Sequence, residues 1–291
     1  NTTGAENTAV GYQALNAHTT ANGCVAIGRK SLLVNTTGAY NTGVGRETLY
    51  ANTTGSDNTA IGNGALFANT TASENVALGV NTLYDSTTGA YNTAIGSNAL
   101  ANNITGSYNV ALGGLALGTQ TDKDNITALG FKAGWKNTGN QNVFVGAYSG
   151  ENHTTGADNV YIGYFAGYDS TTGYQNVCVG KGAGENITGA YNNTAIGKHA
   201  LNTATTGHSN TCIGEASAAL ITTGDGNTCL GKAAGLSITT GVNNTTIGED
   251  SGRSNSPSGE ISTGSNNFVL GNNSIANLYC ADTSISSSDA R

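Results

Sequence analysis

Residues 92–100 read Asn92-Thr93-Ala94-Ile95-Gly96-Ser97-Asn98-Ala99-Leu100, and variants of the first five residues recur along the whole chain as Asn-(Thr/Val)-Ala-(Ile/Val/Leu)-Gly. The closing glycines, which we call the Gly column, are 17 residues apart, except for one interval of 16 and one of 23 residues. A fixed period of this length is typical of a solenoid in which each repeat forms one coil. The Gly column consists of Gly11, Gly28, Gly45, Gly62, Gly79, Gly96, Gly113, Gly130, Gly146, Gly163, Gly180, Gly197, Gly214, Gly231, Gly248 and Gly271.

The residues before each glycine form three further columns. The aliphatic column stands directly before the glycine (Ile27, Ile95), the Ala column comes one residue earlier (Ala60, Ala94), and the Thr/Val column precedes that. Because side chains alternate along a strand, the aliphatic and Thr/Val columns share one face and the Ala column points to the other. We predict that the aliphatic column is the core of the rod and that the Ala column is a small-residue stripe on its outside, suited to close packing of several rods.

The segment after each glycine also keeps a pattern. Its third residue is Ala, Ser or Thr, and its fourth, the Leu column, is Leu from Leu15 to Leu117 and then mostly Gly. Each coil is expected to contain two short strand segments, a kink at the glycine and a return turn that often reads Thr-Thr-Gly. Coils stacked about 4.8 Å apart would give a rod of roughly 75–80 Å.

The predicted fold is therefore all-β: a parallel β-solenoid, or β-roll, of about sixteen 17-residue coils with two short strands per coil. Residues 1–253 are assigned to the repeat rod of fifteen coils, and residues 254–259 to an inserted surface loop that holds the only proline. Residues 260–277 are assigned to the final coil, and residues 278–291 to a C-terminal junction.

Composition excludes several functional classes. The chain of 291 residues has 43 glycines, one proline and no methionine, and only 10% of its residues are charged, which favours short strands and tight turns over helices. A net charge of −7 without a basic patch argues against nucleic-acid binding, and no apolar run is long enough to insert into a membrane. The missing methionine and the start within a turn at Asn1 lead us to expect a fragment or processed product of a longer chain.

Cysteines and histidines are interpreted as structural residues. Three of the five cysteines, Cys178, Cys212 and Cys229, replace alanine in the Ala column, so we expect reduced, buried thiols. The histidines are interpreted as exposed turn residues without a common column or metal-ligand spacing; they are His18, His153, His199 and His208. No serine, histidine and acid recur together, so we expect no enzyme activity, no metal and no cofactor.

An Asn column leads the repeat unit in fourteen of sixteen coils, with Cys24 and Ile126 as exceptions. Stacked asparagine amides at a solenoid corner can bond to the coils above and below. We therefore predict a ladder of side-chain hydrogen bonds through residues such as Asn41 and Asn58.

The units Asn58-Thr59-Ala60-Ile61-Gly62 and 92–100 resemble the repeats of trimeric β-roll heads, which occur in trimeric autotransporter adhesins of bacteria and in phage tail fibres. The resemblance covers essentially the whole chain, although the adhesin repeat is shorter and the extra residues here fall in the Thr-Thr-Gly turn. It implies a left-handed parallel β-roll that assembles as a homotrimer.

The run from Leu278 to Arg291 resembles the junction before an endosialidase-type intramolecular chaperone domain of phage tail fibres. In that family a Ser-Asp bond is cut autocatalytically after trimerisation, and Ser288-Asp289 matches this bond. Asp289 and the two residues after it are still attached, so either the cut falls elsewhere or the chain end has another origin.

These resemblances imply a structural fibre of a phage virion, part of a trimeric tail fibre involved in host attachment. The alternative is the head of a trimeric adhesin on a bacterial cell surface. A third hypothesis, an ice-binding solenoid, is disfavoured because the threonines are adjacent, as in Thr36-Thr37, and adjacent strand residues point opposite ways.

Aromatic residues gather in coils eight to eleven, in the stretch where the Leu column turns to Gly. Two interpretations stay open: the rings fill volume that leucine supplies elsewhere, or they form a patch that binds a host-cell-surface glycan or protein. For the second we single out Trp135, Tyr164 and Tyr168 as receptor contacts, and we expect the variable residue after each glycine to face solvent. The aromatic residues are Phe131, Trp135, Phe144, Tyr148, Tyr161, Tyr164, Phe165, Tyr168 and Tyr174.

Overall fold

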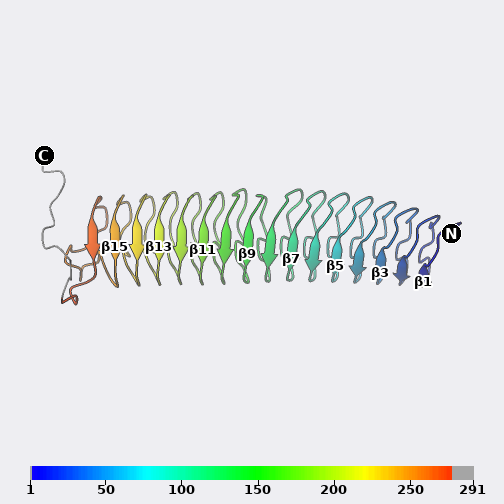
Figure 1. The fold of residues 1–291 in the computed structure, drawn as a ribbon, viewed down its shortest axis with the longest axis horizontal. Coiled ribbons are helices and arrows are strands. Elements are labelled where there is room, and N and C mark those ends of the chain that lie inside the picture. Colours follow the sequence, from blue (N-terminus) through cyan, green and yellow to red (C-terminus); the bar gives the residue numbers. More distant parts are fainter. Residues whose placement is uncertain (1, 277–291) are drawn as a thin grey trace, which may run out of the picture.

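The computed structural model describes residues 2–276, which form a rod of stacked coils (Figure 1). Its strands lie side by side in one parallel sheet that follows chain order, and each pairs with the next in register. This confirms the predicted parallel β-solenoid. The strands are β1 (Thr8–Val10), β2 (Val25–Ile27), β3 (Thr42–Val44), β4 (Thr59–Ile61), β5 (Val76–Leu78), β6 (Thr93–Ile95), β7 (Val110–Leu112), β8 (Thr127–Leu129), β9 (Val143–Val145), β10 (Val160–Ile162), β11 (Val177–Val179), β12 (Thr194–Ile196), β13 (Thr211–Ile213), β14 (Thr228–Leu230), β15 (Thr245–Ile247) and β16 (Phe268–Leu270).

Each described coil contains one strand, so the prediction of two strands per coil was wrong. The segment after the glycine contains two left-handed residues, for example Glu47 with φ 57° and Leu49 with φ 48°. Two left-handed residues so close together break the extended backbone of a strand. The segment is nevertheless tied to its neighbours, because Leu49 N donates to Ala65 O at 3.0 Å and Glu47 N donates to Arg29 O at 2.9 Å.

Backbone geometry explains why the Gly column is constant. Gly45 has φ 137°, which side chains rarely tolerate, and a Cβ placed on it would lie 2.7 Å from the carbonyl oxygen of Gly62 in the next coil. The kink after each strand thus brings successive backbones too close together for any side chain.

The predicted core face was wrong. Ala94 is fully buried, whereas Ile95 beside it is 39% exposed, and the same division holds for Ala60 and Ile61. The rod interior is filled from the opposite wall by the Leu column, of which Leu100 is fully buried. A coil this narrow has room for a large side chain from one wall only, so the strand contributes the small alanine and turns its aliphatic residue outward.

Side-chain size in the two inner columns is complementary. In the two coils where the Leu column is Gly150 and Gly167, the Ala column is aromatic, and Phe144 and Tyr161 are fully buried. A Cβ on Gly134 would lie 2.6 Å from the Phe144 ring, and one on Gly150 would overlap the same ring. The interpretation that rings replace leucine volume is confirmed for Phe144 and Tyr161.

The Asn column forms the predicted ladder. Asn58 N and Nδ2 both donate to Asn41 Oδ1 at 3.0 Å, and Nδ2 also donates to Ala72 O at 2.9 Å. These bonds satisfy amide groups that would otherwise be buried without partners.

A second Asn column was not predicted; it stands seven residues after the glycine and holds asparagine in five coils, at Asn35, Asn52, Asn69, Asn103 and Asn137. Asn52 Nδ2 donates to Asn35 Oδ1 at 2.8 Å and Asn69 Nδ2 donates to Asn52 Oδ1 at 2.7 Å. Ser86 occupies the next position of this column, and neither Asn69 Oδ1 nor Ser86 Oγ has a partner. The serine side chain is too short to continue the ladder.

Coils of unusual length keep the register of the sheet. In the coil of 16 residues Val145 still pairs with Leu129, and across the interval of 23 residues Leu270 pairs with Ile247. The additional residues of the longer coil form turns that are mostly exposed, and Arg253 at their start pairs with Asp250. Length changes are thus absorbed outside the strands.

Candidate functional site

An apolar stripe runs along the outer face of the sheet. It is formed by the aliphatic and Thr/Val columns of β1 to β16, which point away from the core. The aliphatic side chains exposed on it are Val10, Ile27, Ile61, Ile95, Leu112, Ile162, Val177, Ile196, Leu230 and Leu270. A continuous apolar face of this kind is typical of a protein interface.

A second surface, which we call the wall cluster, lies in the turn segments that follow β8, β9 and β10. It contains both aromatic and charged side chains. The wall cluster consists of Phe131, Lys132, Trp135, Lys136, Tyr148, Glu151, Asn152, Tyr164, Phe165, Tyr168 and Asp169.

Ring contacts join two of the three predicted receptor residues. The centroid of Phe165 lies 4.2 Å from that of Tyr164 and 4.7 Å from that of Tyr168. Tyr148 extends the group, with ring centroids 5.3 Å from Phe165 and 5.5 Å from Phe131. Phe131 and Tyr164 are 44% and 45% exposed, so the aromatic group is open to solvent.

Trp135 joins the cluster through charged groups. Its indole lies over the preceding coil, since a Cβ on Gly118 would lie 3.0 Å from Trp135 Cδ1. Lys132 Nζ stands 4.6 Å from the indole centroid and 2.9 Å from Glu151 Oε1. The lysine therefore connects the indole to a carboxylate on the next coil.

Glu151 is the central acid of the wall cluster and is only 6% exposed. Its hydrogen bond raises the pKa of Lys132. Burial, followed by the Glu151 charge, raises the pKa of Tyr168. A buried carboxylate is retained in proteins when it is paired and hydrogen-bonded, as Glu151 is by Lys132.

A polar row borders the aromatic rings. Lys136 Nζ donates to Asn152 Oδ1 at 2.8 Å, and Asn152 Nδ2 donates to Asp169 Oδ1 at 2.7 Å. These three residues occupy the same position in successive coils, so the row rises along the rod by one coil per residue.

The sequence alone did not predict Lys132, Lys136, Glu151, Asn152 or Asp169 as part of this site. Glu151 lies in the same repeat position as Trp135 and Tyr168, and Asn152 lies beside it. That spacing is the signal from which their proximity could have been found.

The prediction of exposed turn histidines was wrong for two residues. His18 and His153 share the second Asn column and are 3% and 0% exposed. The two ring nitrogens of His153 lie 2.9 Å from Ser170 O and Gly156 O, and burial lowers its pKa. His153 therefore takes the place of asparagine in this column and is likewise buried and hydrogen-bonded.

The cysteines of the described region are free and buried, as predicted for Cys178, Cys212 and Cys229. Burial raises the pKa of the Cys178 thiol, so this sulfur is a packing group with little thiolate character. Among residues 2–276 no group of histidine, cysteine and acidic side chains has an arrangement that could hold a metal ion.

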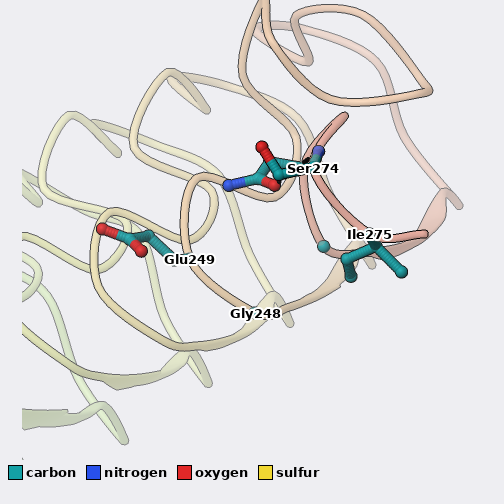
Figure 2. Close-up of a pocket in the computed structure, with 6 residues that line it drawn as sticks. Gly248, Glu249, Ser274 and Ile275 are labelled. Carbon is teal, nitrogen blue, oxygen red and sulfur yellow. Dashed lines mark hydrogen bonds between the residues drawn. The ribbon is translucent and has the colours of Figure 1, made fainter. Parts of the chain in front are cut away.

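An open hollow of about 270 Å³ lies at the end of the rod beside β16 (Figure 2). Glu249 is its one titratable lining residue within the described chain, and its carboxylate pairs with Lys232 at 3.1 Å. The lining residues are Gly248, Glu249, Gly271, Asn272, Ser274 and Ile275. This set provides no pair of acid and base.

Ser288 and Asp289, which match the cleavage junction of tail fibres, lie outside the described residues. In the described part of the chain, no helix has the length and apolar character needed to cross a membrane. In comparisons with known proteins, no family model and no curated protein matches this chain.

Proposed function

We propose that this chain is the rod of a homotrimeric fibre, a segment of a phage tail fibre that takes part in host attachment and has no catalytic role. The observation that carries the proposal is the apolar stripe, whose aliphatic side chains are exposed along the length of the sheet. Covering it with copies of the same chain would remove the exposed aliphatic side chains from water at every level.

The observed orientation of the strand side chains changes which residues are expected to form the trimer interface. The Ala column lies inside each chain, so the interface consists of the aliphatic and Thr/Val columns. Threefold symmetry rests on the resemblance to trimeric β-roll heads, and the assignment to a tail fibre rests on residues 278–291. The parent gene separates the alternatives: a chaperone domain downstream supports a tail fibre, and a coiled-coil stalk with a membrane anchor supports an adhesin.

Sedimentation of matched charge variants tests the assembly. Ile61→Asp with Ile95→Asp places two charges on the stripe, and we expect it to prevent trimer formation. Asn63→Asp with Ser97→Asp places the same charges two residues further on, at exposed positions, and should leave the trimer intact. Ala94→Asp should instead prevent folding, because it buries a charge without a partner. A wild type that sediments as a folded monomer would contradict the proposal.

A further inference from the structure

The wall cluster is not explained by packing of the rod. Phe144 and Tyr161 account for the volume lost from the Leu column, and both are inside. Apart from Tyr174, which precedes β11 and stacks on Tyr191, the remaining rings of this stretch lie on the outside, in three successive coils. They are built from the segment after each strand and leave the apolar stripe free for assembly.

The polar groups of the wall cluster are held in place by one another. Lys132 is fixed between the Trp135 ring and the buried Glu151, and Asn152 is fixed between Lys136 and Asp169. Preorganised side chains of this kind lose little conformational entropy on binding, which favours ligand recognition.

The charges of the cluster are balanced. Lys132 and Lys136 are matched by Glu151 and Asp169, and Lys181, whose Nζ lies 6.0 Å from the Tyr164 ring centroid, adds a single ammonium group, so the surface offers no extended charge of one sign to a polyanion or a polycation. Rings that are exposed at Tyr164 and half-buried at Trp135 and Tyr168, bordered by amide, carboxylate and ammonium groups, instead match a ligand with apolar C–H faces and many hydroxyls. The rise from one coil to the next, about 4.8 Å, is comparable to the length of one pyranose residue.

We propose that the wall cluster binds an uncharged oligosaccharide that lies along the rod, with pyranose rings against Trp135, Tyr164 and Tyr168 and hydroxyls bonded to the row Lys136, Asn152 and Asp169. This inference names the ligand class for the attachment role proposed above. The site is complete within one chain, so it does not depend on trimer formation.

Trp135 is the only tryptophan of the chain, so its fluorescence reports on this site alone. The probes are cellotetraose, maltotetraose and chitotetraose, with heparin as the charged comparison. We expect a saturable change in emission with at least one neutral probe and none with heparin. Tyr164→Ala with Tyr168→Ala keeps the reporter and should weaken binding by about tenfold or more.

The matched control is Tyr91→Ala with Tyr108→Ala, which removes two rings stacked at 5.0 Å elsewhere on the rod and should leave binding unchanged. Absence of a saturable response to every neutral probe at about 10 mM would overturn the inference. Binding of heparin alone, or equal weakening in both double variants, would also overturn it. Sedimentation of the same samples reports on fibre assembly separately.

Discussion

At the scale of single residues, Ser86 interrupts the second Asn column, and we expect this position to be one where a substitution can stabilise the rod. Asn69 Oδ1 and Ser86 Oγ are buried without partners, while asparagine fits this position in neighbouring coils. We expect Ser86→Asn to raise the free energy of unfolding by about 1 kcal/mol per chain, because the amide can donate to Asn69 Oδ1. Chemical denaturation at fixed protein concentration measures this change.

Ser170 provides the control for that prediction. It lies in the same column, but its hydroxyl is 2.7 Å from the Tyr161 hydroxyl. Ser170→Asn should therefore destabilise the rod. Equal effects of the two substitutions would show that the unpaired atoms at Ser86 are not the cause.

His153 predicts a dependence of stability on pH. Burial lowers its pKa in the folded chain, so on acidification the unfolded chain takes up a proton first, below about pH 6.5. Stability is fully present above that pH and falls as the pH drops towards the folded pKa. We expect the melting temperature to fall between pH 7.5 and 5, and His153→Asn to reduce this fall. A rise in melting temperature would mean that the two carbonyls around the ring outweigh its burial.

At the scale of the coil, the inner columns predict a compensating pair. Phe144→Ala should cost about 3–5 kcal/mol by leaving a cavity, and Gly150→Leu should destabilise by overpacking against the Phe144 ring. The double variant restores the pairing seen between Ala94 and Leu100, and Gly150 already has the φ of that leucine, 58° against 50°. We expect it to be more stable than either single variant. Additive losses in a double-mutant cycle would contradict complementary packing.

The coil also shows which structural features a sequence pattern can predict. The period, the position of the strand before each glycine and the amide ladder follow from spacing alone, whereas the second strand expected after the glycine does not form. The alternation of side chains predicts that Ala94 and Ile95 point in opposite directions. Which of the two is buried depends on the distance between the walls of the coil, and sequence spacing does not give that distance. The left-handed backbone at Leu49 was not predicted, because leucine rarely adopts it.

For the wall cluster, the sequence predicted where three rings would lie. The variability of the residue directly after each glycine predicted exposure of Phe131 and Tyr164, and both are exposed, whereas Trp135 and Tyr168, four residues further along their coils, are half-buried. The link from Trp135 to Glu151 through Lys132 depends on distances between side chains in neighbouring coils. Spacing indicates neighbours, but it does not fix the rotamers that bring a lysine onto an indole.

At the scale of the whole molecule, contacts are confined to adjacent coils, so the rod should tolerate loss of a complete repeat. Deletion of residues 46–62 joins Gly45 to Asn63 and keeps every column in phase. We expect a folded rod that is shorter by about 4.8 Å, measured by small-angle X-ray scattering. Deletion of residues 46–53 leaves only nine residues from Gly45 to Gly62, too few to complete a coil around the core, and should break the stacking of the rod at that level. Loss of folding in both variants would show that stability is not distributed coil by coil.

The longer coil before β16 has a consequence for engineering. Its additional residues leave the outer wall after Gly252 without disturbing the pairing of Ile247 with Leu270. The rod therefore has equivalent insertion points at a regular spacing, and foreign peptides can be grafted at the corresponding point of any coil. Two grafts would stand apart by whole multiples of the coil rise, which makes their separation a matter of choosing residue numbers.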